Sequence, residues 1–317
     1  MTSDALHENV LLVYSATLLG LLLVAGAVLA GLVLAGKKNL RPVWLTYASW
    51  WVLGPVTFGA IYLGRIPTIL LFTLMAVLAF KEFARATGLY RDWWTTGTVY
   101  LLILSASVAA MIRDPHSDLP GWFGLYMMLT VVALVALALV PILRNRTQGQ
   151  LQVLALALLG FMCIGWMFLH VALLADLPNA TGCLLYLLLA VELNDVAAFI
   201  FGRLLGRPGK HLLRSQISPN KTWEGALGAL AVSLALPWLL HFSFPHFGTM
   251  QLLLAGLIVG VGGPLGDLSI SLLKRDLGVK DMGTLIPGHG GVLDRIDSLI
   301  YTAPLFLHML RFFGGNA

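Results

Sequence analysis

The chain has 317 residues, of which 58% are hydrophobic and only 11% are charged, with a formal net charge of +5. A soluble domain carries roughly a quarter of charged residues, so this composition excludes an ordinary soluble protein and indicates a polytopic membrane protein. The basic residues lie in short loops between apolar runs, which fits membrane orientation and argues against nucleic-acid binding. The two cysteines, Cys163 and Cys183, lie in or beside apolar segments and have neither metal-ligand nor disulfide spacing.

Ten segments are apolar and long enough to cross a membrane, which takes about 20 residues. They are 10–36, 43–63, 66–81, 93–112, 121–143, 151–175, 183–204, 223–243, 249–275 and 295–313. The first follows an N-terminus without Lys or Arg, unlike a secretory signal peptide, so we expect a retained helix. The predicted fold is all-α: a polytopic integral membrane protein with about ten transmembrane helices.

The distribution of basic residues predicts the orientation. With the N-terminus outside, all of the 20 Lys and Arg except Arg65, Arg113 and Arg311 fall on the inner side, as the positive-inside rule requires. Both termini are then on the non-cytoplasmic side. The longest polar loops, about 205–222 and 276–294, are cytoplasmic and late in the chain. We therefore expect a functional region over 181–317, preceded over 1–180 by transmembrane helices with a scaffold, dimer or lipid-access role.

The ninth span carries several ionisable residues, which are costly at membrane depth and usually mark a site. Asp267, Ser271, Lys274 and Arg275 have the spacing of one helix face. The glycines at 262, 263 and 266 just before them would allow close helix approach. The stripe is either a functional site or a structural Asp–Lys pair that neutralises a buried charge.

A glycine-rich loop, GTLIPGHGGV, leads into Asp294 and Asp297 at the start of the tenth span. Acidic residues there can simply stabilise the helix dipole. Alternatively, Asp294 meets Asp267 across the helix interface, because two carboxylates suit a hard divalent cation such as Mg²⁺, which often bridges to phosphates. The histidine in the loop, His289, is either bonded to backbone or part of the site.

The earlier polar loop is basic and runs directly into a helix. Its basic residues are Arg203, Arg207, Lys210, His211, Arg214 and Lys221. Such a loop can serve only orientation or attraction to anionic lipids. However, Asn220 or Thr222 is a candidate helix cap, and a helix N-terminus beside a lysine can bind phosphate. Cations, helix ends and paired carboxylates together point to phosphoryl or nucleotidyl transfer to a lipid at the cytoplasmic face.

The pattern S-x-x-K-R-x4-K-D-x-G-x2-I-P-G-H-G-G-V-x-D-R-x-D over 271–297 resembles the signature of phosphatidate cytidylyltransferases (CDP-diacylglycerol synthases). The segments ISPNKTWEGALGA at 217–229 and NDVAAFIFGRLLGR at 194–207 are similar to other motifs of that family, and Lys81-Glu82-Phe83 is similar more weakly. The resemblance covers about 190–300 and is only generic over the first 180 residues.

The resemblance implies that CTP and phosphatidic acid give CDP-diacylglycerol and pyrophosphate. It implies that Asp267 and Asp294 ligate Mg²⁺, with a second cation near Ser271, and that Lys221, Lys274 and Arg275 complete the catalytic set. The substrate-binding candidates all lie in the same motifs. They are Asn194, Asp195, Arg203, Ser218, Asn220, Thr222, Ser271, Lys280, Asp281, His289, Gly290, Gly291, Arg295 and Asp297.

The implied partners are CTP, phosphatidic acid, membrane lipids and a second copy of the chain in a homodimer, without nucleic acid. The implied location is a bacterial plasma (inner) membrane, with the site facing the cytoplasm. One alternative is another CTP-dependent lipid enzyme, such as a polyprenol kinase or a CDP-archaeol-type synthase. A second is a secondary transporter that uses Asp195 and Asp267 as a midplane ion site, but no repeated half is visible. A third is a family member that binds CTP without turnover.

Overall fold

The computed structural model describes residues 3–36, 40–206, 211–288 and 290–314, and they are mainly long helices. The helices are α1 (Ser3–Leu34), α2 (Arg41–Tyr62), α3 (Arg65–Ala86), η1 (Leu89–Arg91), α4 (Trp93–Met111), α5 (Phe123–Leu143), α6 (Gln150–Gly160), η2 (Phe161–Met167), α7 (His170–Leu174), α8 (Ala180–Leu204), α9 (Trp223–Leu239), η3 (His241–Ser243), α10 (Thr249–Asp276) and α11 (Leu293–Gly314). Every predicted span coincides with a helical segment, and the sixth corresponds to α6, η2 and α7 together.

Composition supports a membrane crossing for most of these helices. Within the described residues, 7 helices are long and apolar enough: α1 from residue 9, α3, α4, α5, the α6–α7 segment, α8 and α10. Helix α9 is apolar but shorter, with 17 residues. Helices α2 and α11 do not meet the same criterion, and α11 begins with charged residues. The polytopic class is therefore supported, whereas the full count of ten crossings stays a prediction.

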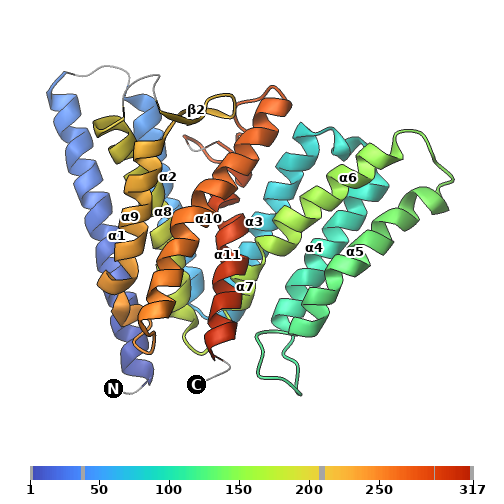
Figure 1. Ribbon diagram of the computed structural model, residues 1–317, viewed down its shortest axis with the longest axis horizontal. Coiled ribbons are helices and arrows are strands. Elements are labelled where there is room, and N and C mark those ends of the chain that lie inside the picture. The colour runs from blue at the N-terminus through green and yellow to red at the C-terminus, as the bar shows by residue number, and fades with distance from the viewer. Residues whose placement is uncertain (1–2, 37–39, 207–210, 289, 315–317) are drawn as a thin grey trace.

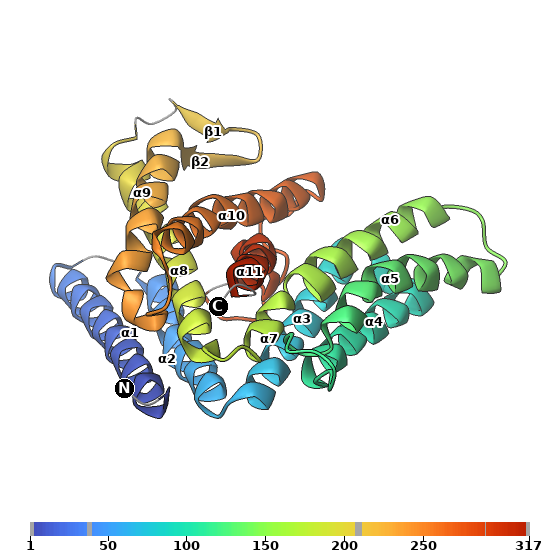
Figure 2. The ribbon, with the colours of Figure 1, turned by 60° about the horizontal axis from the view of Figure 1, so that its bottom comes forward.

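The long helices run between two ends of the molecule (Figure 1). The beginning of α1 and the end of α11 lie at the lower end in that view. The end of α10 and a short hairpin lie at the upper end, and the chain descends from α10 to the start of α11. Figure 2 shows α4, α5 and α6 as a group on one side and α1, α8 and α9 on the other.

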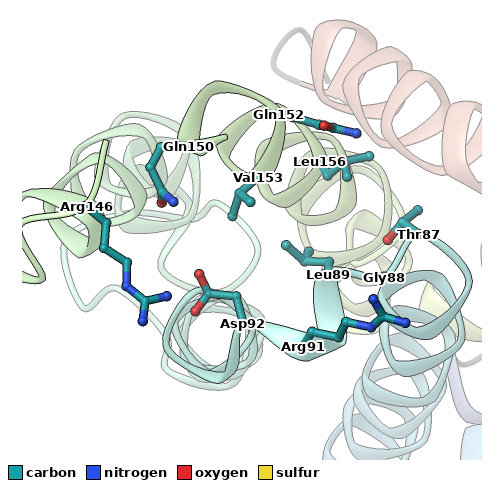
Figure 3. A pocket seen from close by; sticks show the side chains of 10 residues that line it. All are labelled: Thr87, Gly88, Leu89, Arg91, Asp92, Arg146, Gln150, Gln152, Val153 and Leu156. Atoms are coloured by element: carbon teal, nitrogen blue, oxygen red, sulfur yellow. The ribbon is translucent and has the colours of Figure 1, made fainter. Parts of the chain in front are cut away.

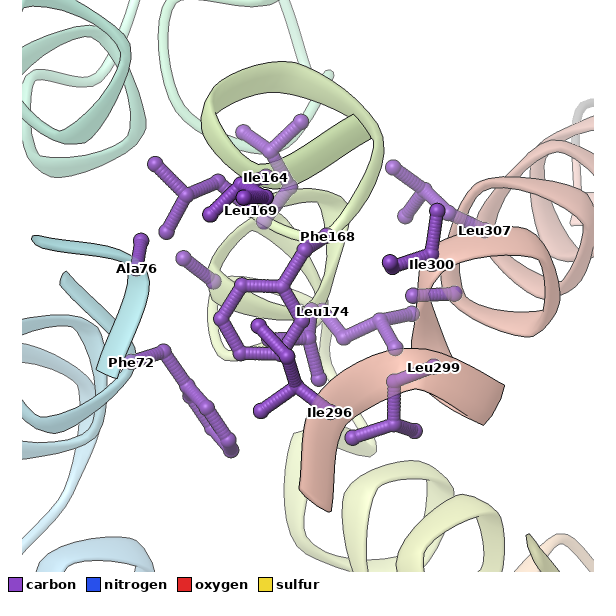
Figure 4. Packing of buried hydrophobic residues seen from close by; sticks show 14 of the residues in the cluster. Phe72, Ala76, Ile164, Phe168, Leu169, Leu174, Ile296, Leu299, Ile300 and Leu307 are labelled. Carbon is purple, nitrogen blue, oxygen red and sulfur yellow. The ribbon is translucent and has the colours of Figure 1, made fainter. Parts of the chain in front are cut away.

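A buried apolar cluster fixes α11 against the N-terminal helices (Figure 4). Phe72 of α3, Phe168 before α7 and Ile296 of α11 meet there and are at most 1% exposed. Contacts of this kind join elements from distant parts of the sequence into one core. The N-terminal helices thus form the wall against which the first turn of α11 is placed.

Helices α10 and α11 approach each other closely at Gly266. A Cβ atom at this position would collide with the backbone oxygen of Asp297 and would reach 3.0 Å from the Cα of Ser298. At Gly262, a Cβ would lie 3.1 Å from the Cγ2 of Thr302. The predicted role of these glycines in close helix approach is therefore confirmed.

The predicted loop at 205–222 contains a two-stranded antiparallel hairpin that differs from the expected irregular loop. Strand β1 (Leu212–Arg214) pairs with β2 (Ser218–Thr222), with Leu212 opposite Thr222. Strands this short, with a proline inside β2, give no alternating apolar pattern that would predict them. The fold is otherwise helical, and the sixth span also differs from expectation because η2 is a π-helix.

Candidate active site

Asp267 lies in the last third of α10 and joins two of the sequence motifs. Its Oδ2 is paired with the ammonium of Lys221, which extends from β2. Its Oδ1 accepts a hydrogen bond of 3.2 Å from the hydroxyl of Ser271, one turn further along α10. The predicted helix face is thus confirmed for this pair. The Asp267 side chain is 26% exposed, so a ligand can reach the carboxylate.

Asp294 lies in the first turn of α11 and is much more enclosed. Its Oδ1 accepts from the Lys274 ammonium at 2.9 Å. Its Oδ2 accepts from the backbone N–H groups of Met282 and Gly291, both at 3.1 Å. The side chain is only 4% exposed. Asp294 therefore pairs with a cation of α10 and also organises the preceding loop.

Two more carboxylates lie near Asp267. The charge of Asp267 acts on Asp195 of α8 and on Asp297 of α11, and the charge of Asp195 acts on Asp297. The charges of Lys221 and Arg295 act on Asp195 in the opposite sense. Asp195 and Arg295 are exposed, whereas Asp297 is 8% exposed and its Oδ1 accepts from Ser298 N–H at 2.7 Å. Helices α8, α10 and α11 thus bring several carboxylates and cations together.

The two other candidates on α8 have different surroundings. Asn194 is 0% exposed, and its Oδ1 accepts from the hydroxyl of Ser233 on α9 at 3.0 Å. This contact joins two helices, and contact with a substrate stays a prediction for this residue. Arg203 is exposed, and its guanidinium carbon lies 5.7 Å from the centre of the Phe199 ring.

The hairpin that carries Lys221 is fixed at two points. Thr222 is the N-cap of α9, where its side chain accepts from Gly225 N–H at 3.2 Å, which confirms one of the two predicted caps. The Arg275 Nε donates to the backbone oxygen of Ile217 at 3.2 Å, linking α10 to the hairpin. Ser218 and Asn220 lie on β2, half-buried and exposed respectively.

The glycine-rich loop folds back on itself before α11. Ile286 and Gly290 exchange two backbone hydrogen bonds, of 2.9 and 3.1 Å. A Cβ at Gly290 would lie 3.4 Å from Asp294 Oδ2 and 3.6 Å from Asp281 Oδ1, so both carboxylates face this glycine. Lys280 is exposed in the same segment. The predicted site residue His289 lies outside the described residues, as do the basic residues Arg207 and Lys210.

Three residues of the first half also contact this loop, and they were not among the candidates from sequence. Thr46 and Ser49 of α2 donate hydrogen bonds from their hydroxyls to Gly288 O at 2.8 Å and to Pro287 O at 2.5 Å. Glu82 of α3 accepts from Leu293 N–H at 2.9 Å. The weak resemblance at residues 81–83 was a signal for Glu82. Nothing distinguishes the two hydroxyls from ordinary helix residues, since both also bond within α2.

The donor atoms suit a hard cation at one carboxylate better than at the other. Asp267 offers accessible oxygens in an acidic neighbourhood, which is the environment that Mg²⁺ takes. Both oxygens of each carboxylate already accept hydrogen bonds, so a cation would compete with Lys221 at Asp267 and with Lys274 at Asp294. The two carboxylates differ in access, because the Asp294 side chain is 4% exposed and that of Asp267 is 26% exposed. Within the described ranges, no three His, Cys, Asp or Glu side chains are arranged as ligands of one metal.

A separate hollow of about 340 Å³ lies at the ends of α3, α4 and α6 (Figure 3). It is lined by Thr87, Gly88, Leu89, Arg91, Asp92, Arg146, Gln150, Gln152, Val153 and Leu156. Its one carboxylate, on Asp92, pairs with Arg144 at 2.6 Å. The hollow shares no residue with the motifs, so the candidate site is the cluster on α8, β2, α10 and α11.

Comparison with known proteins shows the family of the chain. A model of the cytidylyltransferase family matches residues 44–313. The chain is 32% identical over 277 residues to "Uncharacterized protein YnbB" of Escherichia coli (strain K12), covering 85% of this chain and 88% of the relative. It is 36% identical over 206 residues to "Phosphatidate cytidylyltransferase" of Staphylococcus haemolyticus and 35% identical over 206 residues to the Staphylococcus aureus protein of the same name. Each of these two matches covers 64% of this chain and 76% of the relative. The match over most of its length shows that the chain belongs to the cytidylyltransferase family.

Proposed function

We propose that the protein transfers the cytidylyl group of CTP to phosphatidic acid, giving CDP-diacylglycerol and pyrophosphate. The observation that carries this proposal is the pair of lysine–carboxylate contacts, Lys221 with Asp267 and Lys274 with Asp294. The first pair joins the motif at 217–229 to α10 four residues before the motif at 271–297 begins, and the second pair lies within that later motif. Relatives named phosphatidate cytidylyltransferase support the choice of substrates.

The proposed reaction needs charge neutralisation more than it needs a base. The phosphate of phosphatidic acid has a second pKa of about 6 and is largely ionised near neutral pH. One of its oxygens attacks the α-phosphorus of CTP in line, the bond from that phosphorus to the bridging oxygen breaks, and pyrophosphate leaves with the electron pair. Lys221, Lys274 and Arg275 are the cations that would hold the two anionic substrates together.

The two carboxylates would hold a divalent cation, which we propose is Mg²⁺ on Asp267 and Asp294. Bound there, the cation would supply positive charge to the polyphosphate and to the leaving oxygen. For Asp294 to serve, the ammonium of Lys274 has to move from its Oδ1 to a phosphate oxygen. The contact with Asp294 would thus keep the Lys274 ammonium beside the proposed phosphate position. Ser271, bonded to Asp267, is the candidate neighbour of a second cation.

We also propose that the chain crosses a bacterial inner membrane ten times, with both termini outside and the site facing the cytoplasm. The start of α1 and the end of α11 lie at the same end of the molecule, opposite the end of α10 and the hairpin (Figure 1). An even number of crossings requires this arrangement. The ends of α3 and α10, which carry Arg85 and Lys274 with Arg275, lie at the same end as the hairpin (Figure 1). A homodimer in the membrane is part of the same proposal.

The proposal is tested by assaying purified protein in detergent with CTP, phosphatidic acid and Mg²⁺, with and without EDTA. Pyrophosphate and CDP-diacylglycerol should form in equal amounts, and EDTA should stop both. Diacylglycerol and polyprenol serve as alternative acceptors. Formation of CDP with one of these acceptors, and no pyrophosphate with phosphatidic acid, would instead identify a lipid kinase.

A further inference from the structure

Glu82 connects the first half of the chain to the candidate site. It lies in the last two turns of α3, which ends at Ala86, and is 8% exposed. Its Oε2 accepts from the N–H of Leu293, a residue 211 positions away, at 2.9 Å. The N–H of Val292 lies close to the same carboxylate. Glu82 thus caps the N-terminus of α11 from another part of the chain, as a favourably placed negative charge.

The loop is built so that the Glu82 carboxylate can enter it. A Cβ at Gly283 would collide with the carboxylate, and a Cβ at Gly291 would come within 2.5 Å of Oε2. Two glycines on either side of the turn therefore leave room for one acidic side chain. This arrangement ties the position of Glu82 to both ends of the segment at 283–291.

The backbone held by Glu82 is the backbone that places Asp294. Gly291, which borders the Glu82 carboxylate, donates its N–H to Asp294 Oδ2 at 3.1 Å. Leu293, which Glu82 caps, is the residue directly before Asp294. The charge of Asp294 also acts on Glu82. A shift of this turn would therefore move the Asp294 carboxylate relative to Lys274.

A gain in folding stability alone does not explain why a glutamate occupies position 82. The second oxygen of the carboxylate, Oε1, is buried and has no hydrogen-bond partner among the described residues. A buried polar atom without a partner is costly. The folded protein tolerates this cost at a side chain that borders Gly283 and Gly291, on the two sides of the glycine-rich turn.

We propose that Glu82 is a positioning residue for the reaction, fixing the segment 282–293 so that Asp294 and Lys274 keep their mutual geometry. This inference rests on the proposed function, because it assigns a catalytic purpose to that geometry. It makes α3, in the half of the chain without clear motifs, a part of the active site. Thr46 and Ser49 hold the tip of the same loop from α2.

The test compares Glu82→Ala and Glu82→Gln with a matched control, Asp92→Asn. Asp92 is also an acid that caps a helix, accepting from Thr95 N–H at 3.5 Å, but it caps α4, away from the loop. With CTP and phosphatidic acid, Glu82→Ala should lower kcat by about 100-fold, because misplacement by about an ångström can have that effect. The concentration of Mg²⁺ for half-maximal activity should rise, while the KM for phosphatidic acid should stay within about twofold.

Glu82→Gln keeps an oxygen that can accept from Leu293 and should retain more activity than Glu82→Ala. Asp92→Asn should leave kcat and the Mg²⁺ response unchanged. Equal losses in the alanine and glutamine variants, or the same loss in Asp92→Asn, would overturn the positioning role. So would normal kcat in Glu82→Ala.

Hydrogen exchange followed by mass spectrometry gives a readout that does not depend on turnover. Glu82→Ala should speed exchange in peptides from 282–293, whereas Asp92→Asn should not change them. If the wild type makes no CDP-diacylglycerol, the proposed function fails, and this exchange measurement still decides whether Glu82 holds the turn. Unchanged exchange in Glu82→Ala would contradict the inference even in a fully active enzyme.

Discussion

Asp267 and Asp294 differ more in their surroundings than in their chemistry. Asp267 is 26% exposed and accepts from one lysine and one hydroxyl. Asp294 is 4% exposed and accepts from one lysine and two backbone N–H groups. The first is accessible to a ligand, and the second is also part of the framework of the loop. Substitutions at the two positions should therefore differ in their effect on stability.

Replacing either aspartate by asparagine should reduce turnover by at least about 1,000-fold, since each supplies charge at the proposed cation site. Asp267→Asn should retain the thermal stability of the wild type. Asp294→Asn should unfold at a lower temperature, because its amide cannot accept from all three donors. Cytidylyl transfer and thermal unfolding in detergent are measured for both, with Asp276→Asn at the end of α10 as the control. Near-normal turnover in Asp267→Asn would remove this residue from the proposed site.

Lys221→Ala should raise the KM for CTP by roughly 10- to 100-fold, the effect of losing a hydrogen bond to a charged group. Its partner Asp267 is partly exposed, so loss of the ion pair should change stability little. The matched control is Arg146→Ala, which removes a cation from the hollow outside the motifs. An unchanged KM in Lys221→Ala would show that this lysine serves Asp267 alone.

At the scale of elements, the site depends on how α10 and α11 meet. The absence of a side chain at Gly266 brings the backbone of Asp297 against α10. That contact sets the separation of the two helices that carry Asp267 and Asp294. The hairpin then adds Lys221 from the side, held by Arg275.

Gly266→Ala should destabilise the protein by about 1–3 kcal/mol, because the added methyl group overpacks a close backbone contact. The control is Gly97→Ala in α4, where a Cβ would meet nothing within 4 Å. Alanine at that position should be neutral or stabilising by up to about 1 kcal/mol. Chemical denaturation in detergent compares the two variants. Equal stability of Gly266→Ala and Gly97→Ala would contradict the proposed tight packing.

The sequence was sufficient for the helices and for contacts within one motif. Long apolar runs predicted every long helical segment, helix spacing predicted the Asp267–Ser271 contact, and a capping residue marked Thr222. It was insufficient for pairings across elements, because spacing along one helix does not reveal which lysine meets which carboxylate. The hairpin and the π-helix were missed because neither has a periodic signal.

At the scale of the whole molecule, the two halves interlock. Helix α3 and the α6–α7 segment share a core with α11 (Figure 4), and α2 and α3 hold the loop before it. The predicted division at residue 180 therefore separates the motifs from the rest of the sequence. Side-chain contacts nevertheless cross this division, from α2 and α3 to the loop and to α11. The scaffold, dimer or lipid-access role of residues 1–180 stays a prediction.

The proposed orientation predicts the labelling of single cysteines in intact bacterial cells that express the protein. His116→Cys, exposed between α4 and α5, should react with a membrane-impermeant maleimide. Ser215→Cys, exposed in the hairpin, should react only after the membrane is permeabilised. Cys163 and Cys183 are replaced by alanine in both variants. The protein with these two replacements and no added cysteine is the control, and it should not be labelled. The reverse pattern would invert the orientation, and labelling of both without permeabilisation would contradict an odd number of crossings between the two positions.

The central claim is that the nucleotidyl group, and not the terminal phosphate, moves from CTP to the lipid. Purified protein is incubated with phosphatidic acid, Mg²⁺ and CTP labelled at either the α- or the γ-phosphate. For cytidylyl transfer, the α label should enter the lipid and the γ label should leave as pyrophosphate. Transfer of the γ label to a lipid, or no lipid labelling from either form of CTP, would contradict it.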